Sequence, residues 1–233
     1  MIAPPILFQS ADFVVLDKPA GLPVHAGPRG GASVEDWFGL LSRRRRGPWL
    51  AHRLDADTSG CLVVALRRAA LLAAQALFAE GKAEKTYWAV VDGGPAGESG
   101  TVDAPLTKRS SPGGWRMVVD ASGQRAVTDW RVLGRGAGLA WLELHPRTGR
   151  THQVRVHCAH LGCPVRHDPV YGAPSVRGGG MLNLLARAIM LPLTPPLAAT
   201  APPPAHMRDA LLALGWDQPI KNQQTNSAVS IGV

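Results

Sequence analysis

The sequence predicts an α+β fold with a mixed, mostly antiparallel central sheet flanked by helices. Short apolar or alternating segments bounded by Gly, Pro and Ser occur along most of the 233 residues, and such segments are typical of strands. Four segments have helical spacing or an alanine- and leucine-rich composition instead. Helices and strands do not alternate regularly, as they would around a parallel sheet, and this favours the α+β class.

The first half of the chain mixes both kinds of element. In chain order we expect a strand over residues 12–18, a helix over 33–42, a strand over 61–66, a helix over 67–82 and a strand over 85–91. Ser33 and Asp36 have capping-box spacing, and Gly81 is a natural end for the second helix. The run 61–66, CLVVAL, is apolar throughout, which indicates a buried strand.

The second half is richer in short strands. We expect strands over residues 100–106, 115–120, 125–133 and 139–146, a helix over 151–161, two short strands within 181–193 and a helix over 201–216. No repeat or strong linker divides the chain, so residues 1–217 are predicted to form one domain. The polar residues 218–233 are predicted to be a flexible tail.

Charge and cysteine content narrow the class of protein. The net charge of +8 and pI of about 10.1 favour an anionic partner, with nucleic acid first and an acidic membrane surface second. Cys61, Cys158 and Cys163 do not form a disulfide framework. The N-terminus lacks the features of a secretory signal, and no apolar run approaches the roughly 20 residues of a membrane span. We therefore expect a cytoplasmic protein without a membrane partner.

The segment 52–60, HRLDADTSG, concentrates polar groups in front of the apolar run. Ordinary turn chemistry explains the residue types from Asp57 to Gly60. Asp55 is different, because a carboxylate between Leu54 and a buried strand needs a partner or it becomes protonated. The sequence leaves two interpretations: a structural salt bridge, or a catalytic carboxylate held ionised by an arginine.

A second polar concentration lies in residues 145–157, HPRTGRTHQVRVH. If a helix begins near residue 148, Arg150 and the first-turn amides form an anion site. Thr151 and Arg155 then share one face, as do Gln153 and His157. The alternatives are a solvated basic face and a phosphate-contacting surface. The mixture with Gln and His, without compensating acids, favours the second.

Histidines and cysteines in the same region raise the question of a metal site. The possible ligands are His152, His157, Cys158, His160 and Cys163. Their spacing matches neither C-x-x-C nor H-E-x-x-H, so we expect no metal.

The strand over 85–91 carries one of only two tyrosines. Alternation places Lys85 and Tyr87 on one face and Trp88 on the other. A tyrosine that lines an open face can stack on a base and offer its hydroxyl.

Three ordered blocks, HRLDADTSG, KTYWAVV and LHPRTGRTHQVRVHCAHLGCPVRHDPVYG, together resemble the RluA family of RNA pseudouridine synthases. FVVLDKPAGLPVH near the start extends the resemblance over most of the chain. The resemblance implies the pseudouridine synthase catalytic fold and an isomerase that converts chosen uridines of rRNA or tRNA to pseudouridine. It also implies that the reaction needs no cofactor and no metal.

The resemblance also implies roles for residues. Asp55 would be the catalytic aspartate, Tyr87 would stack on the uracil and help to remove the C5 proton, and Arg155 would pair with the carboxylate. Arg53 matches an arginine that helps displace the target base. The RNA-binding residues we predict are His52, Arg53, Thr58, Lys85, Arg150, His152, Gln153 and His157. Whether Asp55 forms a sugar adduct or acts by elimination stays open.

Two departures from the family pattern affect the predicted RNA contacts. No N-terminal RNA-binding module of the S4 type is recognisable, so the contacts are expected from the domain itself, with Arg43 to Arg46 as candidates. Arg187 occupies the place of a usual histidine. The predicted partner is a stem-loop of 23S rRNA or tRNA bound by a monomer. Other interpretations are an RNA-binding protein without catalysis and a metal-dependent hydrolase.

Overall fold

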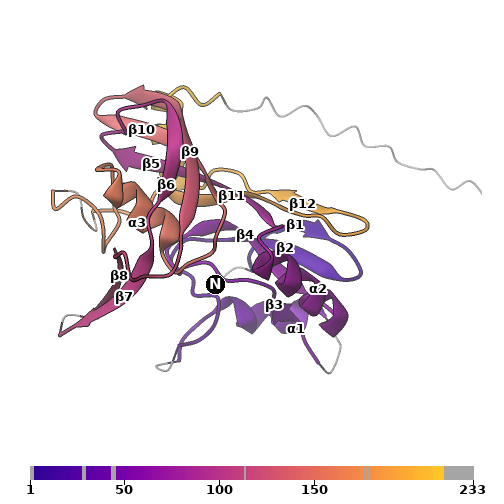
Figure 1. The fold of residues 1–233 in the computed structure, drawn as a ribbon. Coiled ribbons are helices and arrows are strands. Elements are labelled where there is room, and N and C mark those ends of the chain that lie inside the picture. Colours follow the sequence, from indigo (N-terminus) through magenta and orange to yellow (C-terminus); the bar gives the residue numbers. More distant parts are fainter. Residues whose placement is uncertain are drawn as a thin grey trace, which may run out of the picture.

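The computed structural model describes residues 3–27, 30–42, 46–112, 114–175, 177 and 179–217. A ten-stranded sheet forms its centre, in the order β1-β2-β4-β11-β5-β10-β9-β6, with β12 beside β11 and β3 beside β4 (Figure 1). Only the β11–β4 pairing is parallel among these pairs. The predicted mixed, mostly antiparallel sheet is therefore confirmed.

The strands are short and are distributed along most of the described chain. They are β1 Ile6–Gln9, β2 Phe13–Lys18, β3 Trp49–Leu50, β4 Ser59–Ala65, β5 Glu84–Asp92, β6 Ser99–Asp103, β7 Leu106–Ser111, β8 Gly114–Val119, β9 Val127–Gly136, β10 Leu139–Pro146, β11 Leu184–Leu191 and β12 Leu197–Thr200. The helices are the 3-10 helix η1 Val34–Trp37, α1 Phe38–Leu41, α2 Arg68–Ala79, α3 Gln153–His160 and α4 Ala205–Ala213.

The two faces of the sheet explain the sequence patterns. On β4, Cys61 and Val63 pack into one core with α2 and α4, whereas Leu62 and Val64 pack into another with η1 and α1. Both faces are covered, so every residue of β4 is buried and the run is apolar throughout. On β5, alternation sends Trp88 toward α2 and α4 and Tyr87 toward the face that carries α3.

Several predicted elements differ from those observed. The helix expected over 33–42 is a 3-10 turn followed by the single turn α1, although Asp36 Oδ2 does accept from the Ser33 amide at 3.0 Å. The two strands expected within 181–193 are the single strand β11, with a register irregularity between Ala186 and Ala188. Strand β1 was not expected, and 100–106 divides into β6 and the start of β7. The predicted tail, 218–233, lies outside the described residues.

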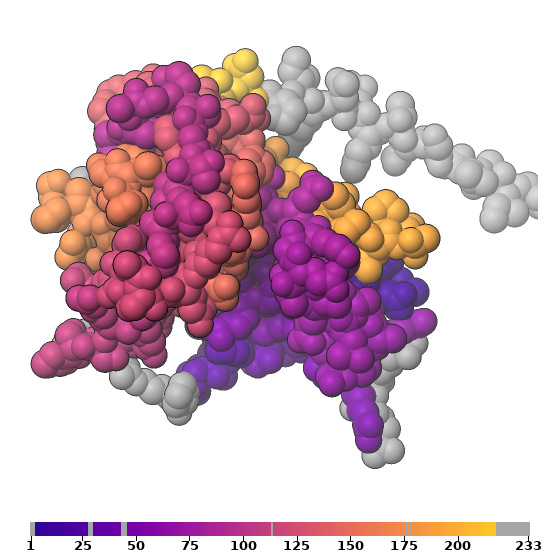
Figure 2. Space-filling model, viewed as in Figure 1, coloured from indigo at the N-terminus to yellow at the C-terminus, as the bar shows by residue number. Residues whose placement is uncertain are grey.

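Strands β7 and β8 form a separate two-stranded sheet that projects from the body of the molecule (Figure 1). Its root packs into a small core with Ala126, Val156 of α3 and Tyr171. The space-filling view shows the body as two masses, the indigo and purple N-terminal third and the pink to orange middle of the chain (Figure 2). The hairpin belongs to the second mass.

Candidate active site

The loop before β4 brings Asp55 to the start of a central strand. Gly60 makes this approach possible: its φ is +106°, and a Cβ there would lie 2.3 Å from the Ala186 carbonyl oxygen of β11. Only glycine tolerates both conditions. Tyr87 of β5 pairs with Ala186 across the neighbouring ladder, and Tyr87 and Leu54 pack into the same core. Asp55 and Tyr87, which are 32 positions apart in the sequence, are thus both held near the start of β4.

Arg155 of α3 joins two carboxylates at this point. Its Nη1 lies 3.2 Å from Asp55 Oδ2, and its Nε and Nη2 donate to Asp168 at 2.7 and 2.8 Å. Arg155 is buried, and burial alone would lower its pKa. The bonds and charges of Asp168 and Asp55 outweigh burial, so the pKa is raised and the guanidinium stays charged. The predicted pairing of Arg155 with Asp55 is present in the structure.

Asp168 is the fixed anchor of this array. It is completely buried, and its Oδ1 also accepts from the backbone amides of Val170 and Tyr171 at 2.8 and 3.0 Å. Burial raises the pKa of Asp168. The Arg155 bonds and these two amides lower it by more than burial raises it, so the net shift is downward. Sequence reasoning did not identify Asp168. Its only signal is a lone acid in the polar block HDPVYG, which does not reveal its partner.

The Tyr87 hydroxyl has no hydrogen-bond partner among the described residues, so it is free to meet a ligand. Burial raises the pKa of Tyr87, and the charge of Asp55 raises it further. The side chain is therefore a neutral phenol near pH 7. This fits stacking and hydrogen bonding directly, whereas removal of a proton by Tyr87 stays a prediction.

His152 lies on the other side of Asp55. Its Nε2 is 3.7 Å from Asp55 Oδ1, and its Nδ1 is 2.9 Å from the Tyr171 hydroxyl. It has the left-handed φ of +53° immediately before α3, a strained conformation for a residue with a side chain. Burial lowers the pKa of His152, and the charge of Asp55 only partly opposes this. The ring is thus neutral near pH 7 and lies against the Asp55 carboxylate.

Lys18 fixes the backbone of the Asp55 loop. The side chain is completely buried, and its Nζ donates to the carbonyls of Pro19, Leu22 and Ala56 at 2.8, 2.8 and 2.7 Å. Burial lowers its pKa to about 8 against the charges of Asp57 and Asp55. Sequence reasoning placed Lys18 only at a strand end. Its three carbonyl partners come from two loops that the sequence does not bring together.

Two predicted RNA-binding residues instead point into the protein. Gln153 bonds the Val127 carbonyl and Thr128 through Nε2, at 3.0 and 2.9 Å. His157 lies 2.8 Å from Thr128 Oγ1 and 3.1 Å from the Ala104 carbonyl. Both side chains are buried, so the prediction that they contact RNA is wrong. The i, i+4 spacing gave their common face correctly, but that face packs against β9.

Three further members of the predicted set bond to backbone or are buried. His52 Nε2 accepts from the Val63 amide at 3.0 Å, and burial lowers its pKa to about 4. Lys85 Nζ donates to the Thr148 carbonyl at 3.1 Å, and burial lowers its pKa. Thr58 is buried. These residues support the loops around Asp55. Arg53 and Arg150 are exposed and remain predicted RNA contacts.

The predicted anion site at Arg150 is not formed. Helix α3 begins at Gln153, not near 148, and Gln153 Oε1 accepts from the Arg150 amide at 3.0 Å and from Thr148 Oγ1 at 2.7 Å. A side chain therefore occupies the amide that was expected to meet an anion. Within the described part of the chain, no group of three or more His, Cys, Asp and Glu residues is placed to hold a metal ion.

Arg187 lies on the face opposite Tyr87. Its guanidinium lies over the Trp88 ring, 4.3 Å from the centroid, and donates to the Ala201 carbonyl. The departure from the family pattern therefore affects the packing of β11 rather than the site around Asp55.

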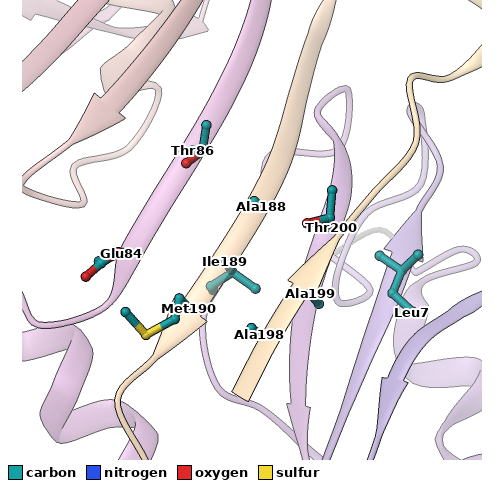
Figure 3. Close-up of a pocket in the computed structure, with 9 residues that line it drawn as sticks. All are labelled: Leu7, Glu84, Thr86, Ala188, Ile189, Met190, Ala198, Ala199 and Thr200. Carbon is teal, nitrogen blue, oxygen red and sulfur yellow. The ribbon is translucent and has the colours of Figure 1, made fainter. Parts of the chain in front are cut away.

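Two cavities lie away from Asp55. One, of about 400 Å³, is a shallow groove over β1, β5, β11 and β12, lined by small and apolar side chains with Glu84 at one side (Figure 3). The other, of about 570 Å³, is lined by Arg46, Trp49, Leu66, Arg67 and Arg68. Neither includes a residue of the Asp55–Arg155 array.

Comparison with known proteins decides the family. The sequence model described as RNA pseudouridylate synthase matches residues 12–160, more than half of the chain. This chain belongs to the RNA pseudouridine synthase family of the RluA type. Its members are isomerases, and the predicted fold and enzyme class are confirmed.

Two relatives and one solved structure cover between 78% and 92% of this chain. A Zymomonas mobilis protein described as an uncharacterized RNA pseudouridine synthase is 39% identical over 214 residues, covering 90% of this chain and 98% of that protein. The ribosomal large subunit pseudouridine synthase D of the same organism is 38% identical, covering 78% and 60% respectively. The structure of human RNA pseudouridylate synthase domain containing 4 superimposes with a TM-score of 0.77, at 29% identity, over 92% of this chain and 94% of that one.

Proposed function

We propose that this RNA pseudouridine synthase isomerises uridine in a stem-loop of rRNA or tRNA, with Asp55 as the catalytic residue that initiates the rearrangement. The observation that carries the proposal is the Asp55–Arg155 contact of 3.2 Å, beside a Tyr87 hydroxyl that has no hydrogen-bond partner among the residues the structure describes. One relative is described as acting on the large ribosomal subunit, which favours rRNA over tRNA.

The chemistry requires one bond to break and another to form at the same sugar. The bond between C1′ and N1 breaks, the uracil turns, and C5 bonds to C1′. The C5 proton then leaves and N1 gains a proton, so the composition of the nucleotide is unchanged. Asp55 is a nucleophile or a base in this sequence, and Arg155 stabilises the negative charge on its carboxylate. The uridine must leave its stack to reach Asp55, because the carboxylate is itself only partly exposed.

Tyr87 and Arg155 act on different partners. The neutral phenol of Tyr87 stacks on the turning uracil and offers its hydroxyl as a donor. Arg155 is fixed by Asp168, so it presents Nη1 to Asp55 without having to reorganise. The array is therefore ready before RNA arrives.

Exposed cations supply the RNA contacts. Arg53 precedes Asp55 by two residues and is exposed, as is Arg150 beside α3. Further away, Arg46 and Arg68 line the larger cavity without an ion pair among the described residues. Arg43 to Arg45 lie outside the described residues. These side chains supply phosphate contacts, which fix position rather than sequence.

The protein is proposed to act in the cytoplasm as a monomer. No helix in the described part of the chain is long and apolar enough to cross a membrane.

The test is a map of pseudouridines in total RNA from cells with the wild-type gene, without the gene, and with Asp55→Asn. The expected result is one or a few sites lost in both altered strains. If no site is lost, purified protein is assayed on unmodified rRNA and tRNA transcripts. Failure of the wild-type protein on both RNAs would overturn the proposal.

Two controls separate the competing interpretations. Asp55→Asn should retain RNA binding while it loses isomerisation, because the change keeps the shape of the side chain. A wild-type protein that binds RNA but does not isomerise it would be a binding protein only. Activity that disappears with excess chelator and returns with metal would favour a metal-dependent enzyme.

A further inference from the structure

One face of the β7–β8 hairpin carries the Trp115 ring and the other carries two arginines. In its register Ser110 faces Trp115, Arg109 faces Arg116, and Lys108 faces Met117. Alternation therefore places Trp115, Lys108 and Met117 on one face and the two arginines on the other. Arg109 pairs with Asp120 at 2.7 Å, whereas Arg116 has no ion pair among the described residues. Asp120 therefore offsets one of the two like charges that face each other across the hairpin.

The root of the hairpin is tied to the catalytic array. The Met117 amide donates to the Tyr171 hydroxyl at 3.0 Å, and that hydroxyl lies 2.9 Å from His152 Nδ1. Tyr171 also lies under Arg155, with the guanidinium carbon 5.2 Å from the ring centroid. The position of the hairpin is thus set by residues that surround Asp55.

Trp115 extends this array toward solvent. Its ring stacks on His152 with centroids 5.2 Å apart and planes 27° from parallel, and His152 Nε2 lies 3.7 Å from Asp55 Oδ1. Lys108 Nζ lies 4.8 Å from the Trp115 centroid. Although packed on one side, Trp115 remains 45% exposed. A large aromatic surface held this close to a catalytic carboxylate, next to a cation, fits a nucleotide base with its phosphate.

We propose that Trp115 is a stacking platform for an unpaired base next to the flipped uridine, and that Lys108 neutralises the phosphate of that nucleotide. This inference rests on the proposed function for the identity of the flipped base. His152 contacts both Trp115 and Asp55. A uridine held at Asp55 and Tyr87 would therefore place the adjacent nucleotide of the strand near Trp115. Stacking accepts any base, so Trp115 contributes affinity and holds the strand open rather than reading sequence.

Binding is measured in the Asp55→Asn background, so that no turnover occurs. The probes are an oligouridylate of about twelve nucleotides and an oligomer of the same length with abasic riboses. The two probes carry the same phosphates and differ only in their bases. Trp115→Ala is expected to weaken oligouridylate binding by roughly 5- to 150-fold and to leave abasic binding unchanged. Trp115→Phe should retain most of the affinity.

Two matched variants test the assignment. Trp115→Leu keeps apolar cover over His152 but has no ring, so it should behave as Trp115→Ala; thermal unfolding checks that each variant is folded. Lys108→Ala should weaken both probes, since it removes a phosphate contact. If Trp115→Ala and Trp115→Leu bind both probes as the parent does, or weaken both equally, the platform is refuted. Because these experiments measure binding and not turnover, the stacking proposal can be refuted while the isomerase proposal stands.

Discussion

Two buried cations hold the Asp55 loop, and they use different kinds of partner. Lys18 donates to three backbone carbonyls, including that of Ala56 at 2.7 Å, next to Asp55. Arg155 donates to the carboxylates of Asp55 and Asp168. Lys18 therefore fixes the path of the chain, whereas Arg155 fixes a side chain and its charge. The difference also appears in the pKa values, lowered to about 8 for Lys18 and raised for Arg155.

The comparison suggests that the fork of Arg155 matters more than its charge. Arg155→Lys keeps one positive charge but cannot bond both oxygens of Asp168 and also reach Asp55. We expect unfolding free energy to fall by about 3 kcal/mol, because a buried pair is left incomplete. We expect kcat to fall by roughly 100-fold or more, since Asp55 loses its positioned partner.

Urea unfolding and single-turnover assays measure the two losses for Arg155→Lys separately. Asp168→Asn is the matched variant: it leaves Arg155 and Asp55 in place and removes only the anchor. If Arg155→Lys keeps near-normal kcat, charge alone is sufficient and the contrast with Lys18 fails.

Lys18 should be needed for the loop rather than for charge. In Lys18→Met the carbonyls of Pro19, Leu22 and Ala56 lose a shared donor in the interior. Unsatisfied buried acceptors of this kind reduce the unfolding free energy by about 2 kcal/mol. Limited proteolysis should then cleave near Ala56 more readily. Unchanged cleavage and stability in Lys18→Met would show that other contacts hold the loop without Lys18. One such contact is the hydrogen bond that the Gly21 amide donates to the Ala56 carbonyl.

Only one of the two cations, Lys18, is expected to make stability depend on pH between about 8 and 10.5. The pKa of Lys18 is lowered to about 8 from 10.5, so between these values the folded protein binds fewer protons than the unfolded chain. The contribution of Lys18 to stability therefore rises with pH across that window, by at most about 1.4 kcal/mol per pH unit for one proton. Arg155 contributes no such slope there, because its pKa is raised. Urea unfolding from pH 7 to 10.5 in wild type and Lys18→Met measures the difference. Equal slopes would contradict the Lys18 assignment.

Sequence patterns correctly predicted structural features that depend only on residues close together in the sequence. Alternation in β5 placed Tyr87 and Trp88 on opposite faces, and the apolar run identified β4. The family resemblance supplied the pairing of Asp55 with Arg155, a hundred positions apart. Helical spacing could not tell which face of α3 is buried, because Gln153 and His157 satisfy their polar groups inside the protein. Asp168 and Lys18 stayed hidden because their partners come from distant segments.

Replacing an exposed cation is expected to have the smallest effect on stability, and it shows how a cation behaves when it is not buried. Arg150 lies beside the helix that carries Arg155, but it is exposed, and among the described residues its side chain donates only to the Arg125 carbonyl, at 3.1 Å. Arg150→Ala should change unfolding free energy by less than about 0.5 kcal/mol. It should lower RNA affinity modestly and reduce the slope of log K against log salt by about one. Titrations at several salt concentrations measure this slope. The control is Arg131→Ala, which changes an exposed arginine of β9 that pairs with Glu143 of β10. An unchanged slope would show that Arg150 does not contact RNA phosphate. A large loss of stability in Arg150→Ala would show that burial does not distinguish the cations that support the fold from those that contact RNA.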